Sequence, residues 1–325
     1  MNMKVVYSSI YSKHDPPHFP HIENSTRLEL ALDALGEVEV LSPEGAGDPL
    51  EVHDGTYVEM VRRASEAEEQ IDIDTYTNRF TYESALMALG GAFTAYKVEG
   101  IALVRPPGHH AGRYGRAMGA PTQGFCIFNN IAYAASKAEG RVAIIDFDVH
   151  HGNGTQEIFY LDPKVLHIDL HQDPSTIYPG TGFPFETGDG EGKGTKVNIL
   201  FPPGGGDDLV LEVIPFIQSL LDQFKPDVVG FSAGFDGFSG DGLASLEFTE
   251  ASFEALGGLR EKRRWFAVLE GGYSVGLRRG LPAFVRGVER KPEEPRPKES
   301  KSEVKMKFTR SLEETKYHLR ERWKL

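Results

Sequence analysis

The chain has 325 residues, 40% of them hydrophobic, with 35 Lys and Arg against 48 Asp and Glu and a formal net charge of −13. This composition excludes a disordered or fibrous chain, and the acidity argues against broad binding to nucleic-acid phosphates. The lone cysteine, Cys126, rules out an internal disulfide and a Cys-rich metal site and fits a reducing compartment. Because no apolar run approaches the roughly 18 residues of a membrane span, we expect a soluble cytoplasmic protein with no nucleic-acid or membrane partner.

Short β-branched runs alternate with segments of helical periodicity along most of the chain. The predicted strands are Lys4–Tyr7, Val38–Leu41, Ile101–Val104, Val142–Ile145, Val165–Leu170, Lys196–Leu200, Asp227–Phe231 and Phe266–Leu269. The predicted helices are Thr26–Leu35, Glu83–Lys97, Asn130–Ala138, Leu209–Phe224 and Thr249–Leu259. Several strands are apolar throughout, as buried parallel strands must be. This alternation predicts one α/β domain over residues 1–288, with a mostly parallel open sheet and helices on both faces.

The end of the chain differs from this body. Residues 289–325 hold 12 basic and 8 acidic side chains, and three prolines between Lys291 and Lys298 predict an extended linker. Apolar residues then recur at helical spacing, namely Phe308, Leu312, Leu319 and Trp323. They predict an amphipathic C-terminal helix. The sequence leaves open whether this tail is frayed, docks on the body or docks on a second subunit.

Polar side chains gather directly after five of the predicted strands. These segments are Arg105–Ala111, Asp146–Gly154, His171–Asp173, Ser232–Asp236 and Glu270–Tyr273. The carboxyl ends of parallel strands open onto one edge of a sheet, and ligands bind at that edge. We therefore expect histidine, aspartate and tyrosine side chains from five strands to meet at one rim.

One of these segments has the spacing of a metal site, Asp146-x-Asp148-x-His150. In extended chain, residues two apart point to the same side, so two of the three can bind a metal while the third orients them. Asp236 from another strand completes a set of two carboxylates and one imidazole, which leaves a position open for water. Oxygen and nitrogen ligands favour zinc, while Fe²⁺, Co²⁺ and Mn²⁺ remain possible. A single D-x-H pair is more often a surface turn, so the prediction depends on this co-location.

A second segment carries the adjacent histidines His109 and His110 after a Pro-Pro-Gly turn. Beside a metal-activated water, one serves as general base while the other positions the water or stabilises charge. Asp146 or Asn153 can fix their tautomers. Tyr273 follows two glycines, and its hydroxyl can donate to a developing oxyanion.

Together these motifs resemble the histone deacetylase superfamily, which also includes acetylpolyamine amidohydrolases. The resemblance runs from about His21 to Tyr273, through the His-His loop, the Asp-x-Asp-x-His loop, a Pro-Gly-Thr-Gly segment, Ser-Ala-Gly-Phe-Asp and Leu-Glu-Gly-Gly-Tyr. It implies a single α/β domain of arginase-like topology and a metal-dependent hydrolase that removes acetyl groups from linear amides.

The resemblance also implies roles for individual residues. Zinc would be held by Asp148, His150 and Asp236; His110 would act as general base and later acid; His109, backed by Asp146, would be its electrostatic partner; and Tyr273 would polarise the acetyl carbonyl. Asn153 stands where the classical eukaryotic nuclear enzymes carry aspartate.

Further positions match the family's substrate tunnel and its other sites. The tunnel for an acyl-lysine side chain would be formed by Gly124, Phe125 and Tyr178, with Leu243 near its mouth, and Arg27 matches an arginine of the internal acetate channel. A structural potassium ion would use Asp146, Asp148, His150, Asp169 and Leu170.

We predict a zinc-dependent deacetylase acting on acetyl-lysine in proteins or peptides, because no obvious acidic gatekeeper accompanies Leu243. An acetylpolyamine or other small-molecule amidohydrolase is the alternative. An arginase-like ureohydrolase would need more carboxylates to hold two metals. A catalytically silent acyl-lysine binder would have no need of the intact His109, His110 and Tyr273.

Overall fold

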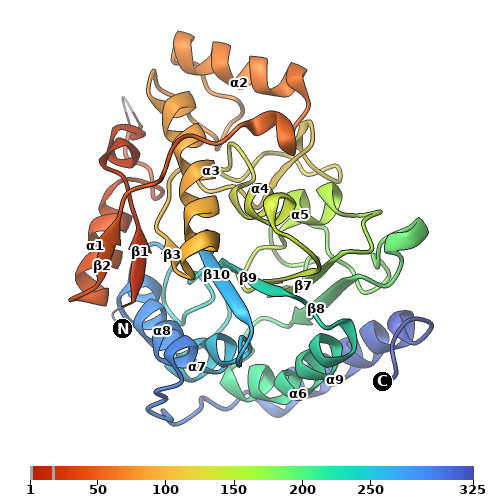
Figure 1. Cartoon of the computed structure of the whole chain (residues 1–325). Helices are drawn as coiled ribbons and strands as arrows, with labels where there is room; N and C mark the ends of the chain where they lie inside the picture. Colours follow the sequence, from red (N-terminus) through yellow and green to blue (C-terminus); the bar gives the residue numbers. More distant parts are fainter. Residues whose placement is uncertain (1–2, 17–18) are drawn as a thin grey trace.

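A parallel sheet of eight strands forms the centre of the computed structural model, which describes residues 3–16 and 19–325 (Figure 1). Its strands are β1 (Lys4–Val6), β2 (Glu39–Leu41), β3 (Ile101–Ala102), β6 (Val142–Asp146), β7 (Val165–Gln172), β8 (Lys196–Phe201), β9 (Val228–Ala233) and β10 (Arg264–Leu269). Their order is β2-β1-β3-β10-β9-β6-β7-β8, and every neighbouring pair is parallel. A small antiparallel hairpin, β4 (Ala111–Gly112) with β5 (Gly115–Arg116), lies outside this sheet.

Helices flank the sheet on both sides (Figure 1). They are α1 (Thr26–Leu35), α2 (Gly55–Ala67), α3 (Thr81–Val98), α4 (Asn130–Lys137), α5 (Asn153–Ile158), α6 (Asp207–Phe224), α7 (Glu250–Gly258), α8 (Leu281–Glu289) and α9 (Ser302–Leu319). α3 and α4 pack on the central strands from one side, while α6, α7, α8 and α9 lie on the other. No helix of the described ranges is long and apolar enough to cross a membrane.

The predicted α/β fold is confirmed. All eight predicted strands form the sheet, with ends that differ by one or two residues, and the five predicted helices are present. Three helices were not predicted, α2, α5 and α8. α5 is a short helix inside the glycine-containing segment after His150, where glycine masks helical periodicity.

Close helix packing on the sheet depends on small side chains. α3 buries a run of alanines and glycines, including Ala85, Ala88 and Ala92. α3 also meets the loop after β2: at Gly90 a Cβ atom would lie 1.7 Å from the carbonyl oxygen of Gly45, so only glycine allows this loop to approach. The core strands β6, β7, β8 and β9 are buried along their whole length, as expected for a sheet covered on both faces.

The C-terminal segment, residues 291–325, crosses the body and ends beside β8. It has no regular structure from 291 to 301 and then forms α9. The four residues of the predicted apolar stripe, Phe308, Leu312, Leu319 and Trp323, are all buried. The Phe308 ring lies 5.0 Å from that of Phe201 on β8. Of the alternatives left open by the sequence, docking on the body describes this helix.

The five strands followed by polar segments stand side by side in the sheet, as β3-β10-β9-β6-β7. Their carboxyl ends therefore form one continuous edge, and the loops that follow them meet there. The fold places the predicted site residues at this edge.

Candidate active site

Three metal-competent side chains converge where β6 and β9 end. Asp148, His150 and Asp236 each offer a ligand atom, and these atoms lie within 4.8 Å of one another. Nδ1 of His150 lies 3.1 Å from an oxygen of Asp148 and 3.1 Å from an oxygen of Asp236. One ring nitrogen has a single proton to donate, so a shared cation accounts for both approaches better than two hydrogen bonds do. The donor set, two carboxylates and an imidazole, fits a divalent metal.

Backbone amides hold the two carboxylates in place. The amides of His150 and Gly271 donate to the two oxygens of Asp148, at 2.9 and 2.7 Å. The amide of Val149 donates to Asp236 at 3.0 Å. A side chain at position 271 would collide with Oδ2 of both carboxylates. The glycine therefore allows the loop after β10 to approach the cluster closely.

The expectation that Asp146, Asp148 and His150 share one side of extended chain was wrong. β6 ends at Asp146, and residues 148–150 lie in a bend, so the alternation of an extended strand does not continue past Asp146. Asp146 lies apart from the metal-competent trio, and its Oδ2 accepts a hydrogen bond from Nδ1 of His109 at 2.9 Å. The carboxylate thus orients a neighbouring histidine.

The two adjacent histidines have pKa values shifted in opposite directions. Burial alone would lower the pKa of His109, but the carboxylates of Asp146 and Asp148 outweigh it and raise this pKa well above its usual value. Burial and the positive charge of His109 hold the pKa of His110 well below its usual value. A charged and a neutral imidazole therefore lie side by side, with ring centroids 4.1 Å apart.

The hydrogen bond on His110 defines which of its nitrogens is free. Its Nδ1 lies 2.8 Å from Oδ1 of Asn153, whose amide nitrogen in turn donates to the carbonyl oxygen of Ala117 at 3.0 Å. Because Oδ1 of Asn153 only accepts, Nδ1 of His110 carries the proton. The lone pair is then on Nε2, as a general base requires.

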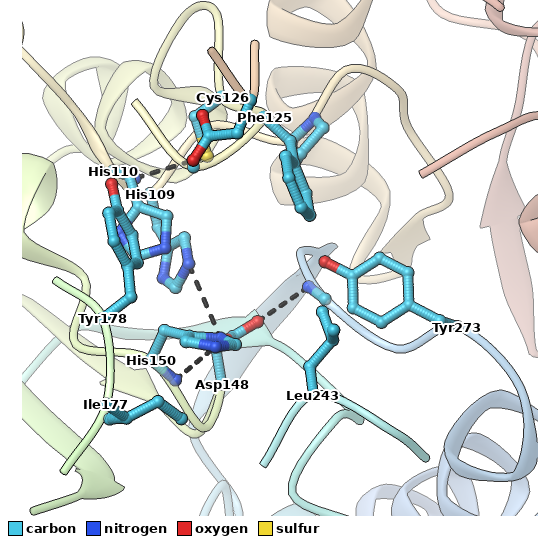
Figure 2. Close-up of a pocket in the computed structure, with 14 residues that line it drawn as sticks. His109, His110, Phe125, Cys126, Asp148, His150, Ile177, Tyr178, Leu243 and Tyr273 are labelled. Carbon is cyan, nitrogen blue, oxygen red and sulfur yellow. Dashed lines mark hydrogen bonds and ion pairs between the residues drawn. The ribbon is translucent and has the colours of Figure 1, made fainter. Parts of the chain in front are cut away.

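Tyr273 faces the His pair from the other side of the pocket, with its hydroxyl directed inward (Figure 2). Burial raises the pKa of this hydroxyl well above its usual value, so it stays protonated and can donate. Arg27 lies against the Tyr273 ring, 4.7 Å from its centroid, and its Nε donates to the carbonyl oxygen of Gly272 at 2.7 Å. The buried arginine therefore supports the loop that carries the tyrosine.

A pocket of about 250 Å³ opens above these groups. Its lining includes all four predicted tunnel residues, Gly124, Phe125, Tyr178 and Leu243. A Cβ atom at position 124 would lie 2.6 Å from the His110 ring and 2.8 Å from the Tyr178 ring. Glycine at this position therefore keeps the passage between the two rings open.

The five residues predicted for potassium divide between two clusters. Asp146 and Asp169 lie with His167 in a buried group whose ligand atoms are within 4.8 Å of one another. The side chains of Asp148 and His150 belong to the other cluster, and Leu170 is a buried apolar neighbour of Asp169. His167 was not predicted, and neither of its ring nitrogens has a hydrogen-bond partner among the described residues.

Sequence reasoning also missed residues of the pocket itself. Asp74, Cys126 and Ile177 line it, and Asp74 is an acidic pocket residue that the sequence did not reveal. Oδ2 of Asp74 accepts a hydrogen bond from Thr122 at 2.6 Å. Asp74 lies in the loop before α3, away from every strand end, so the rule that located the other residues could not find it.

Comparison with known proteins supports the fold and identifies the family. The model of the histone deacetylase domain matches residues 21–288. An uncharacterized protein of Methanocaldococcus jannaschii is 44% identical over 87% of this chain and 87% of its own length. A probable deacetylase of Methanothermobacter thermautotrophicus is 40% identical over 90% of this chain and 92% of its own. The crystal structure of the HDA15 HD domain superposes with a TM-score of 0.83, at 29% identity, over 99% of this chain and 97% of that one.

The fold and the arrangement of the site define an α/β protein of the deacetylase class. The chain belongs to the histone deacetylase family. The predicted resemblance is therefore confirmed.

Proposed function

We propose that the protein is a zinc-dependent deacetylase that hydrolyses N-acetyl amides, with acetyl-lysine in proteins or peptides as its substrate. The observation that carries this proposal is the meeting of Asp148, His150 and Asp236 at the floor of a pocket that His110 and Tyr273 also reach. A divalent metal bound there would polarise the acetyl carbonyl and make a bound water more acidic.

The protein's own residues move the protons. Nε2 of His110 takes the proton from the attacking water as the water oxygen bonds to the acetyl carbon. The Tyr273 hydroxyl donates to the carbonyl oxygen as its negative charge develops. His110 then gives the proton to the leaving amine, the C–N bond breaks, and acetate and a free amine remain. The opposite pKa shifts of His109 and His110 suit this division between a charged partner and a neutral base.

The shape of the pocket supports a long, thin substrate. Phe125 and Tyr273 lie edge to face with ring centroids 6.3 Å apart, and Tyr178 closes the side next to His110. Aromatic walls bury the methylenes of a lysine side chain. An acetylpolyamine has the same methylene chain, and the Asp74 carboxylate would attract its remaining ammonium groups. It therefore stays the second candidate substrate.

The decisive experiment measures kcat/KM on zinc-loaded protein for an acetyl-lysine peptide and for an acetylated polyamine, each with and without chelator. We expect peptide turnover that the chelator abolishes. A preference for the polyamine, lost in the Asp74→Asn variant, would transfer the same chemistry to small-molecule metabolism. Binding of the peptide without turnover would instead identify a silent acyl-lysine binder.

Metal analysis distinguishes the proposed deacetylase from an arginase-like ureohydrolase. One zinc per chain is expected, whereas a ureohydrolase would need two divalent ions bound close together. A potassium ion held by Asp146, Asp148, His150, Asp169 and Leu170 is a separate proposal, tested by the dependence of activity on potassium concentration. That the protein works in the cytoplasm also stays a prediction, and cell fractionation tests it.

A further inference from the structure

One buried carboxylate beside the active site has no part in the proposed chemistry. Glu270, the first residue after β10, is 0% exposed. Its Oε2 accepts hydrogen bonds from the backbone amides of Gly108 at 2.9 Å and His109 at 3.1 Å. A single side-chain oxygen thus binds two consecutive amides of the loop that carries the His pair.

The sequence of that loop explains why it needs this acceptor. Pro106 and Pro107 come directly before Gly108 and have no N–H. The first two amides after the prolines are therefore those of Gly108 and His109, and both residues are buried. Leaving a buried amide without an acceptor is costly, so without Glu270 the loop would turn these amides elsewhere and move the imidazoles with them.

The backbone around Glu270 contacts the other parts of the site. Its carbonyl oxygen accepts a hydrogen bond from Arg27, the residue that supports the Tyr273 ring. The next amide, Gly271 N, donates to Oδ2 of Asp148 at 2.7 Å. Glu270 and Gly271 therefore connect the His pair, the metal-competent cluster and Tyr273, and they resist movement of these groups relative to one another.

We propose that Glu270 is a positioning residue, whose carboxylate holds the His-pair loop, residues 105–112, in register with the metal-competent cluster and Tyr273. This inference rests on the proposed deacetylase function. Glu270 would affect turnover by fixing the position of the His pair, without contacting the substrate. A misplacement of about 1 Å costs on the order of 10² in rate, which sets the size of the expected effect.

The chain contains a matched control for this arrangement. Glu254 on α7 also accepts two consecutive amides after a proline, those of Glu293 at 3.1 Å and Glu294 at 3.0 Å. These amides belong to the C-terminal segment, and Glu254 pairs with Arg286 at 3.1 Å. Glu254→Met likewise removes a carboxylate that accepts from two consecutive amides, here one on each oxygen, and these amides lie in a segment that does not line the active-site pocket.

The test compares Glu270→Met, Glu270→Gln and Glu254→Met as zinc-loaded proteins. Methionine keeps the size of the side chain and removes the acceptor, whereas glutamine keeps an acceptor oxygen. We expect Glu270→Met to lose about 10²-fold in kcat with KM and zinc content close to wild type. Glu270→Gln should recover most of kcat, and Glu254→Met should leave it unchanged. Wild-type kcat in Glu270→Met, or equal losses in the Met and Gln variants, would overturn the proposal.

Amide hydrogen exchange gives a readout that does not need activity. Peptides covering 105–112 should exchange faster in Glu270→Met and at the wild-type rate in Glu254→Met. Should the wild-type protein turn over no acetyl amide, the proposed function fails while exchange still tests the positioning. If Glu270→Met does not fold, Glu270→Asp withdraws the acceptor by one methylene and is expected to lose kcat as well; full activity of that variant contradicts the proposal.

Discussion

The same device serves two regions of the molecule with different consequences. In the His-pair loop and in the C-terminal segment, the two backbone amides that follow a proline donate hydrogen bonds to a glutamate side chain. Glu254 has Arg286 beside it to balance its charge, and the segment also docks on the body through its buried apolar side chains. Glu270 is surrounded by other titratable groups at the edge of the sheet, including His109 and Cys126. The active-site edge is thus arranged for chemistry and the C-terminal segment for stability, and substitutions should separate the two.

The largest effect on activity is expected for Asp236→Ala. Two ligands from the β6 loop cannot hold a divalent metal at the open site, so zinc content and turnover should both be lost. Elemental analysis of purified protein and an acetyl-lysine assay measure this. Asp222→Asn, which changes an exposed carboxylate paired with Arg263, should leave both unchanged. One zinc per chain retained in Asp236→Ala would refute the assignment of this ligand.

Tyr273→Phe should lower activity without affecting metal binding. The substitution removes one donor to the developing oxyanion, which costs on the order of 10²–10³ in kcat. Zinc content and melting temperature should stay at wild-type values, because no metal ligand changes. Steady-state kinetics and elemental analysis on the same preparation decide it. Turnover near the wild-type rate would remove Tyr273 from the mechanism.

The pH profile tests the neutral state of His110. Only the unprotonated imidazole accepts a proton, so activity should fall as pH decreases through its lowered pKa, below the usual imidazole range. Asn153→Asp would place a carboxylate 2.8 Å from Nδ1 and raise that pKa, moving the acid limb of kcat/KM to higher pH by about 1–3 units. Profiles of the two proteins that coincide would show that another group controls this limb.

The sequence predicted which strands form the site better than it predicted how individual side chains lie in it. Strands such as β6 and β9 begin with apolar runs, 142–145 and 228–231, so their positions follow from the sequence, and parallel topology then brings His110, Asp148 and Asp236 to one edge. Residue-level geometry was harder to predict. Asp146 was expected to face the same side as Asp148, but the strand ends there and the chain bends. Asp74 reaches its place through tertiary contacts that no local pattern encodes. His167 lies two residues before Asp169 on β7, and the alternation of that strand could have placed it there.

Glu270 shows where the limit lies. Its position in Leu-Glu-Gly-Gly-Tyr is visible in the sequence as part of a resemblance. Its two hydrogen bonds join residues more than 160 positions apart. The prolines before Gly108 indicate that the next amides need an acceptor, and the strand order that puts β10 beside β3 supplies it. Predicting this contact needs both the prolines, which are visible in the sequence, and the pairing of β10 with β3, which is known only from the structure.

The smallest effect on activity is expected in the C-terminal segment, where the cost should fall on stability. Phe308 on α9 is 0% exposed and packs on Phe201, whereas Met306 on the same helix is 71% exposed. Phe308→Ala should lower the free energy of unfolding by about 3–5 kcal/mol through the lost burial and the cavity left behind. Met306→Ala should change it little, and kcat should be unchanged in both. Denaturant unfolding and kinetics measure the two quantities. A large drop in kcat for folded Phe308→Ala would mean that the segment also acts on the active-site edge, because β8 borders β7, whose Asp169 lies beside Asp146.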